Sequence, residues 1–483
     1  MGLITALVAV MVGIVGCSGQ TVAGKPTVME DIDTDSAGGM PVTDGPSGSK
    51  ENVDPAQLEV EGTDGGEMDI IATNAIADLY DYWHEQMPEH FDQEFEELQR
   101  LLSYDSGGEG AEICGESTAG LVNAFYCGGG GEDVIAWDRG ELLPALNEMF
   151  GEMSVVGVLA HEMGHAVQFR LGEKSNMDMN TPTIVREQQA DCYMGNYFRY
   201  VNGGKSKYFD INNGEGLNKV LATLFFIRDP AGAGHMDEHA HGLAFDRVYA
   251  FQEGFTKDPA RCAEMDIDEI DGRIAEKERT NTEVAESDEG DIDPTQANII
   301  ALLQESLDAA FEANGVDQPE FVDNGSTCES GDATSPVTYC PDENIIGYDA
   351  EALRELAAKP DPAAVPGEAD SGGLGDFAAF AELASRYALA VQKSIGAPLD
   401  DEKAGLRTAC LTGAWAAFAD SEDAGDLRLA VGDLDEAVAE LLLEESLIAA
   451  DVNGEGVPSG FARVEAFRRG FMEGSAPCTE DFS

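Results

Sequence analysis

The stretch LAHEMGHAVQ at residues 159–168 has an altered copy, LASRYALAVQ, at residues 383–392. The outer letters recur in register, whereas HEMGH in the first copy has become SRYAL in the second. Three further segments recur in the same order along the chain: FYCGGGGEDVIAWD (125–138) with TYCPDENIIGYD (338–349), ADCYMGNYF (190–198) with TACLTGAWA (408–416), and FDRVYAFQEGFTKDPARC (245–262) with FARVEAFRRGFMEGSAPC (461–478). Because four matches in one order are hard to explain by chance, the sequence predicts an internal duplication.

The length of 483 residues is enough for two or three domains. The repeats predict two homologous modules, at 67–271 and 294–483, joined by a polar and acidic linker at 272–293. Residues 17–66 are rich in Gly, Asp, Thr and Pro, which predicts an acidic flexible tether before the first module.

Hydrophobic spacing predicts helices over 70–87, 154–172 and 181–198 in the first module. The segment 134–138 is short, rich in β-formers and preceded by a glycine turn, so it predicts a strand. The expected fold class is α+β and mostly helical. Each module should contain a small β-sheet and a metal-binding helix or its remnant, cross-linked by disulfides.

The charge of the chain is strongly negative. It contains 28 Lys and Arg against 93 Asp and Glu, a formal net charge of −65. Such a field repels nucleic acid and anionic lipid head groups, so a polyanion is not an expected partner. The simplest interpretation is a solvated acidic surface.

The N-terminus is an apolar run that is short for a bilayer span and stops at Cys17. Residues 14–17, Ile-Val-Gly-Cys, resemble a bacterial lipobox, which implies a signal peptide at 1–16 and a lipid on Cys17. No Lys or Arg precedes the apolar run, so an ordinary secretory signal is the alternative. We expect an exported protein, either secreted or anchored through the lipid to the outer face of the cytoplasmic membrane.

Eight cysteines remain after Cys17, an even number that indicates disulfides in an exported protein. No Cys-x-x-Cys pair supports a zinc site made of thiolates. The cysteine spacing is nearly the same in both modules, which predicts the same two bridges twice. The predicted pairs are Cys114–Cys127, Cys192–Cys262, Cys328–Cys340 and Cys410–Cys478.

The letters HEMGH form an H-E-x-x-H motif. On a helix, His161 and His165 stand on one face, so both imidazoles can reach one zinc ion. Glu162 points toward the same opening and can take a proton from a metal-bound water. The alternative is a pair of histidines on a helix surface.

A zinc hydrolase site needs three protein ligands and one open position. Glu187 and Asp191 lie one turn apart on the next predicted helix. Glu187 can supply the third ligand, and Asp191 can accept a hydrogen bond from a ligand histidine and fix its tautomer. A solvated acidic face is the alternative, but Ala190 and Cys192 on the same helix favour burial.

The three segments HEMGHAVQ, REQQADCYMGNY and HGLAFDRVYAFQEGF…C together resemble the bacterial neutral zinc metallopeptidases of gluzincin type, over most of 70–262. The resemblance implies Zn²⁺ bound by His161, His165 and Glu187, with Glu162 as general base, and peptide hydrolysis by a zinc-activated water without a covalent intermediate. It also implies a compact α+β fold in which the strand at 134–138 edges the active-site cleft. His241 is then a candidate for stabilising the oxyanion of the transition state, with His235 and His239 as rivals.

The second module has lost this chemistry. The two copies align Ser385, Arg386 and Leu389 with the motif residues His161, Glu162 and His165, Gly405 with Glu187, Ala409 with Asp191, and Val457-Pro458 with the His-Gly pair. The residues that both copies keep include Gln168/Gln392, Arg247/Arg463, Gly254/Gly470 and Asp138/Asp349, and we interpret them as scaffold.

The sequence thus predicts an extracytoplasmic zinc metallopeptidase whose second module is a non-catalytic pseudo-peptidase and whose partner is a peptide or protein substrate. The competing class is a non-catalytic binding lipoprotein of the cell surface that uses peptidase-like folds.

Overall fold

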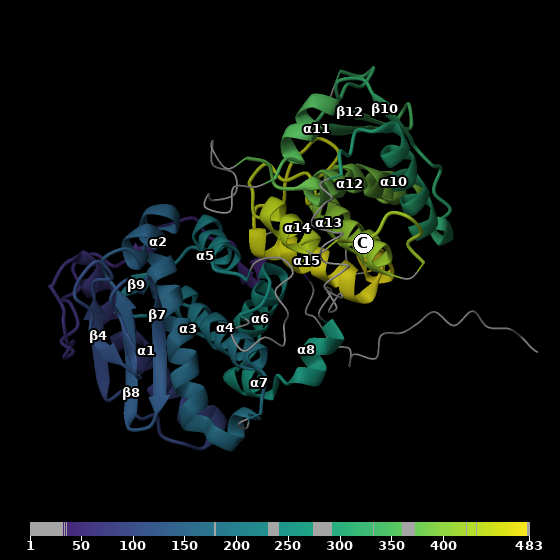
Figure 1. Cartoon of the computed structure of the whole chain (residues 1–483). Helices are drawn as coiled ribbons and strands as arrows, with labels where there is room; N and C mark the ends of the chain where they lie inside the picture. The colour runs from purple at the N-terminus through teal and green to yellow at the C-terminus, as the bar shows by residue number, and fades with distance from the viewer. Residues whose placement is uncertain are drawn as a thin grey trace, which may run out of the picture.

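A computed structural model describes residues 32, 34, 36–177, 180–229, 241–273, 292–331, 333–359, 372–421, 423–430 and 432–480. Two lobes follow one another along the chain and meet through helices α5 and α6 of the first and α14 and α15 of the second (Figure 1). The fold is mixed α+β and about half helical, with small sheets. The signal peptide, Cys17, His235 and His239 lie outside the described residues.

The first lobe packs helices against one face of a three-stranded sheet. Its main elements are α1 (Glu67–Phe91), β4 (Arg100–Tyr104), β7 (Ala124–Gly129), β8 (Glu132–Asp138), α2 (Leu142–Phe150), α3 (Glu152–Leu171), α4 (Thr183–Asn202), α5 (Glu215–Phe226), α6 (Ala244–Thr256), α7 (Pro259–Glu264) and α8 (Ile267–Arg273). The strand order is β4-β8-β7, with β4 parallel and β7 antiparallel to β8. The helices predicted at 70–87, 154–172 and 181–198 correspond to α1, α3 and α4.

The second lobe also contains helices and a three-stranded sheet. Its main elements are α10 (Ala297–Ala310), β10 (Glu320–Asp323), β11 (Val337–Cys340), β12 (Ile345–Tyr348), α11 (Ala350–Leu356), α12 (Asp376–Ser394), α13 (Ala404–Asp420), α14 (Asp433–Leu441), α15 (Gly460–Glu473) and α16 (Ala476–Glu480). Its sheet has the order β10-β12-β11, again with one parallel and one antiparallel neighbour of the central strand.

The aspartates at the ends of the two central strands have the same structural role. Asp138 accepts hydrogen bonds from the backbone of Leu142 and Gly140, at the start of α2. Asp349 is the N-cap of α11 and accepts from the backbone of Glu351 and Ala352. A side-chain oxygen at this position satisfies N–H groups that the helix cannot pair internally, which confirms these aspartates as scaffold.

Two expectations about the first lobe are corrected. The strand at 134–138 is the centre of its sheet, and β7 is the edge strand that contacts α3. Residues 36–66, predicted as tether, are folded: β3 (Gly48–Ser49) pairs with β9 (Phe209–Asp210), and Thr43 binds the side chain of Asn213. Their composition is polar, but partners far away in the chain satisfy their backbone groups, which composition alone cannot reveal.

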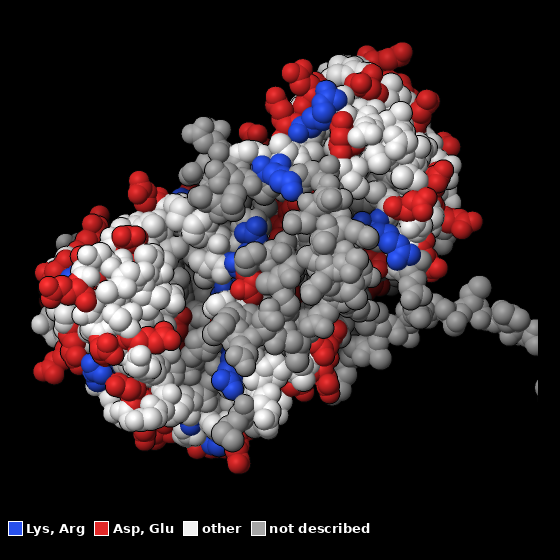
Figure 2. All heavy atoms as spheres, in the orientation of Figure 1, with Lys and Arg blue, Asp and Glu red and all other residues white. Residues whose placement is uncertain are grey.

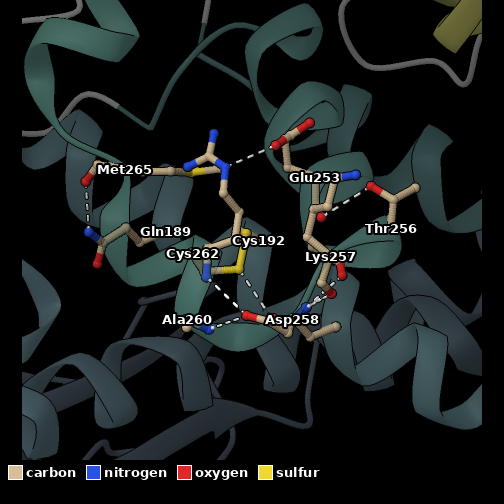
Figure 3. The surroundings of a disulfide bond; sticks show 12 residues. Gln189, Cys192, Glu253, Thr256, Lys257, Asp258, Ala260, Cys262 and Met265 are labelled. Carbon is tan, nitrogen blue, oxygen red and sulfur yellow. Dashed lines mark hydrogen bonds and ion pairs between the residues drawn. A yellow bond between two sulfur atoms is a disulfide. The ribbon is translucent and has the colours of Figure 1, made fainter. Parts of the chain in front are cut away.

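All four predicted disulfides are present in the described structure: Cys114–Cys127, Cys192–Cys262, Cys328–Cys340 and Cys410–Cys478. Cys192 and Cys262 join α4 to α7, with Cα atoms 5.5 Å apart (Figure 3). Beside this bridge Gln189 donates a hydrogen bond of 2.9 Å to the carbonyl oxygen of Met265. The segment after α6 is therefore tied to the helix that carries Glu187, and such bridges fit an extracytoplasmic protein.

Acidic side chains are spread over both lobes on the face shown in Figure 2, where Lys and Arg are sparse. Among the described residues, no helix is long and apolar enough to cross a membrane.

Glycines allow the helices of each lobe to cross at very short distance. A Cβ on Gly254 of α6 would overlap the carbonyl oxygen of Cys192 on α4, and a Cβ on Gly195 of α4 would overlap that of Phe251. The second lobe has the same pair of contacts between α13 and α15, where Gly470 faces Cys410 and Gly413 faces Phe467. Only glycine fits at Gly254 and Gly470 because the helix backbones touch there.

We predict that Gly254→Ala destabilises the protein by about 1–3 kcal/mol or more, because the added methyl group forces the two helices apart. Gly45→Ala is the matched control, since nothing lies within 4 Å of a Cβ at that position and its φ is not positive. Urea unfolding of both variants measures the difference. Equal stability of the two would show that the crossing is looser than described.

Candidate metal centre

The candidate site lies where α3 crosses α4. Gly164, inside the HEMGH motif, makes this crossing possible: a Cβ at Gly164 would lie 2.9 Å from the Cα of Ala190. Helix α3 presents His161, Glu162 and His165, and α4 presents Glu187 to them. The spacing in the sequence determines which residues share a face of each helix. The close approach at Gly164 brings these faces of α3 and α4 together.

Three side chains converge at this crossing. His161 Nε2 lies 3.1 Å from Glu187 Oε2, and His165 Nε2 lies 3.4 Å from Glu187 Oε1. The two imidazole Nε2 atoms are 3.2 Å apart. Ligand atoms of His161, His165 and Glu187 all lie within 4.8 Å of one another, so one ion could contact all three.

The other nitrogen of each histidine also has a partner. His161 Nδ1 lies 2.7 Å from Asp191 Oδ1, and His165 Nδ1 lies 3.0 Å from Gln168 Oε1. Both acceptors require a proton on Nδ1, so they leave the Nε2 lone pairs free to face Glu187 and a metal. Asp191 therefore lies where it can accept a hydrogen bond from His161.

A buried ion pair holds Asp191 in place. Arg247 of α6 donates to both of its carboxylate oxygens at 2.9 Å, and both residues are almost fully buried. Arg247 also donates to the carbonyl oxygen of Ile227, 2.9 Å away, at the end of α5. The three helices α4, α5 and α6 are therefore connected to the imidazole of His161 through one guanidinium group.

Glu162 lies beside the histidines without contacting either within hydrogen-bond distance. Its Oε2 accepts a hydrogen bond of 2.7 Å from the backbone N–H of Tyr126 on the edge strand β7. Burial raises the pKa of this carboxyl group above its ordinary value. A carboxylate with a raised pKa and one fixed oxygen suits a general base.

The electrostatics of the ligands favour positive charge at the crossing. Burial by itself lowers the pKa of His161, but the carboxylates of Asp191 and Glu187 outweigh it and raise that pKa to about 10. Burial would raise the pKa of Glu187, yet the two histidines hold it well below its ordinary value. The imidazoles thus lie among ionised carboxylates, an environment that stabilises a bound cation.

His241 lies at the border of the site and is half exposed. Its Nδ1 is 3.2 Å from Asp229 Oδ1, a contact that raises the pKa of the imidazole, while Asp229 Oδ2 accepts from the backbone N–H of His241 and of Gly242. Glu187 also raises the pKa of His241. The structure therefore gives this candidate a fixed partner, Asp229, that the sequence reasoning did not identify.

The sequence reasoning also missed the contacts that Gln168 and Arg247 make with the site. Gln392 and Arg463, which the sequence alignment pairs with these residues, make similar contacts in the second lobe. Gln168 and Gln392 each donate to a backbone carbonyl at the start of the next helix, that of Arg186 and Ala404 respectively. Arg247 and Arg463 likewise donate to equivalent carbonyls, those of Ile227 and Leu443. The scaffold interpretation is confirmed, but it is incomplete, because Gln168 and Arg247 hold His165 and Asp191 as well.

The equivalent position in the second lobe is filled by protein. Arg386, which replaces the glutamate of the motif, is fully buried and donates to the carbonyl oxygens of Asp451, Leu447 and Ala450. Burial lowers the pKa of this guanidinium to about 10. At Gly405, opposite Glu187, a Cβ would lie 2.5 Å from the carbonyl oxygen of Ala449. A backbone segment therefore occupies the space that the third ligand would need.

A second acidic cluster lies between α12 and α14 and consists of Asp376, Asp433 and Glu436. Glu436 accepts from the backbone of Phe377 at 2.8 Å, and Asp433 accepts from that of Ala430 at 2.7 Å. Glu436 thus caps the start of α12, whereas Asp433 and Asp376 accept from backbone N–H groups outside the helices, those of Ala430 and Ile292, so each carboxylate has a structural partner.

The donor set on α3 and α4 suits zinc. Two imidazoles and one carboxylate are a common three-ligand set of hydrolytic zinc sites, which leave a fourth position open. Their geometry, the fixed tautomers and the negative surroundings all fit that ion.

Residues 29–265 match a family model described as "Putative neutral zinc metallopeptidase". Neither a curated protein nor a solved structure was found to match the chain. The matched range contains the whole metal centre, from the β7 strand to the disulfide at Cys262, and confirms the resemblance drawn from the motifs. Residues 29–265 therefore belong to the neutral zinc metallopeptidase family.

Proposed function

We propose that the first lobe hydrolyses peptide bonds with a zinc ion held by His161, His165 and Glu187. The observation that carries this proposal is the convergence of these ligand atoms within 4.8 Å, with the buried carboxyl group of Glu162 beside them. When bound, zinc supplies a Lewis acid that acidifies water and polarises the scissile carbonyl.

The protein groups divide the remaining work. Glu162 takes the proton of the attacking water and passes it to the leaving amine, while the N–H of Tyr126 keeps the carboxylate in position. His241 donates a hydrogen bond to the carbonyl oxygen as negative charge develops there. Asp191 and Gln168 keep the ligand histidines in the required tautomer.

The protein acts outside the cytoplasm in this proposal. Four disulfides and the lipobox-like sequence before Cys17 support export, with a lipid anchor as the only link to a membrane. The substrate is a peptide or protein, and the net charge of −65 argues against nucleic acid.

The second lobe is a non-catalytic copy of the first in this proposal. The same strand order, the same glycine crossings and the matched contacts of Gln392 and Arg463 support a duplication. The buried Arg386 and the backbone against Gly405 support the loss of metal binding.

Glu162→Gln should reduce peptide hydrolysis by about 10²–10⁴-fold and leave zinc bound, because Glu162 is assigned as base and not as ligand. Glutamine keeps an oxygen that can accept from the N–H of Tyr126, so the local structure should persist. Cleavage of a denatured protein substrate and metal analysis of the same sample measure both effects. Wild-type turnover, or loss of the metal, would contradict the assigned role.

Metal analysis of the full chain should find one zinc per molecule, and Glu187→Ala should remove it together with the activity. Chelation should lower the melting temperature of the wild type, because a ligand that binds only the native state stabilises it. Zinc-free protein without hydrolysis would favour the binding lipoprotein instead.

Restoring the three ligands in the second lobe should not create a second zinc site. In Ser385→His/Leu389→His/Gly405→Glu the new glutamate would meet the carbonyl oxygen of Ala449. Ser385→His/Leu389→His, which leaves Gly405 unchanged, is the control for folding. Two zinc ions per molecule in the triple variant would refute the account of the filled site.

A further inference from the structure

Helix α6 begins without a cap of its own. Its N-cap, Leu243, has no side chain that can accept a hydrogen bond, so the first N–H groups of the helix need other partners. Asp435, on α14 of the second lobe, supplies one: its Oδ1 accepts from the backbone N–H of Phe245 at 3.1 Å. Asp435 is 3% exposed, and its negative charge lies at the positive end of the α6 dipole.

The same carboxylate holds Arg228 at the end of α5. Asp435 Oδ2 lies 2.9 Å from Arg228 Nε. Arg228 donates to the carbonyl oxygen of Phe225 at 2.8 Å, and its guanidinium lies 3.8 Å from the centre of the Phe225 ring. One side chain of the second lobe thus contacts both Arg228 at the end of α5 and Phe245 at the start of α6.

Residues next to Arg228 and Phe245 belong to the proposed active site. Asp229, next to Arg228, holds the backbone and imidazole of His241. Arg247, two residues after Phe245, holds Asp191 and through it His161. The two residues that Asp435 contacts are therefore close in sequence to the site. Arg228 is adjacent to Asp229, the partner of His241, and Phe245 is two residues before Arg247, the partner of Asp191.

A side chain of the first lobe makes a similar contact with the start of a helix in the second lobe. Asn218 on α5 accepts from the backbone N–H of Gly460 at the start of α15, at 3.0 Å. Helix α15 also has its own cap, since Ser459 accepts from the N–H of Ala462. The start of α15 therefore has acceptors from both lobes, whereas the side chain that accepts from the start of α6 belongs to the second lobe.

Aromatic contacts fix the boundary on either side of these polar ones. Phe245 packs on Phe471 with ring centroids 5.5 Å apart, and Phe255 packs on Phe461 at 5.2 Å. The start of each helix contacts the end of the other, so α6 and α15 run antiparallel. Gln252 adds a hydrogen bond of 2.9 Å to the carbonyl oxygen of Phe461. These contacts remain when Asp435 alone is changed, so its effect can be measured in an intact two-lobed protein.

We infer that the second lobe is a positioning element for the active site of the first, and that Asp435 is the positioning residue through which it acts. The inference rests on the proposed function insofar as the site is catalytic. Without Asp435, Arg228 and the start of α6 are released, and His241 loses its fixed place beside the metal centre.

Asp435→Ala, Asp435→Asn and Asn218→Ala, each in the full chain, test this inference. We expect Asp435→Ala to lower kcat by about 10-fold or more with a smaller change in KM. A misplaced His241 would stabilise the transition state less, and substrate binding would change little. Zinc should remain at one equivalent. Amide hydrogen exchange in the peptides covering Arg228–Asp229 and His241–Arg247 should accelerate by about 10-fold.

The two other variants separate positioning from general weakening of the lobe boundary. Asp435→Asn keeps an acceptor for the N–H of Phe245 and should recover most of the exchange protection and part of kcat. Asn218→Ala removes the matching contact at α15 and should leave kcat and the exchange of both peptides at wild-type values. Should Asp435→Ala be too unstable to purify, the partial loss in Asp435→Asn replaces it as the test.

Unchanged kcat and exchange in the Asp435 variants would overturn the inference, and so would an equal loss in Asn218→Ala. If the wild type hydrolyses no peptide, the proposed function has failed, and the hydrogen exchange alone then decides whether Asp435 positions the segment.

Discussion

The approach of α4 to both α3 and α6 at distances that only glycine permits is the constraint on which the rest of the first lobe depends. Gly164 lets α3 lie against Ala190, and Gly254 lets α6 lie against Cys192 on nearly the same turns of α4. Glu187 and Asp191 lie on those turns too, so the packing that brings the backbones together also brings the carboxylates to His161. A methyl group at either glycine would separate side chains whose contacts are all shorter than 3.5 Å.

Burying charge at such a crossing is costly unless each charge is paired. Asp191 is paired twice, by Arg247 and by the imidazole of His161. In the second lobe the residue aligned with Asp191 is Ala409, and Arg463 there donates to the carbonyl oxygen of Leu443 and interacts electrostatically with the carboxylate of Glu440.

The two lobes depend on each other unequally. The helix that completes the metal centre, α6, takes the cap of its first turn from Asp435, whereas α15 carries its own cap at Ser459. The first turn of α6 therefore depends on the second lobe for the acceptor of the Phe245 N–H. Arg386, whose guanidinium donates to backbone carbonyl oxygens, is part of the packed interior of the second lobe.

What the sequence by itself determined is local or repeated: helical spacing placed His161 and His165 on one face, and the doubled cysteine spacing predicted all four bridges. The spacing of one helical turn between Glu187 and Asp191 was enough to predict that both carboxylates lie on the same side of their helix. Only the tertiary structure decided that Gln168 and Arg247 contact the site, that residues 36–66 are folded, and that β8 is central. It also decided that Asp435, 190 residues from Phe245, caps α6. These features depend on donors and acceptors that meet only after folding, and neither periodicity nor composition records which distant group will satisfy a buried polar atom.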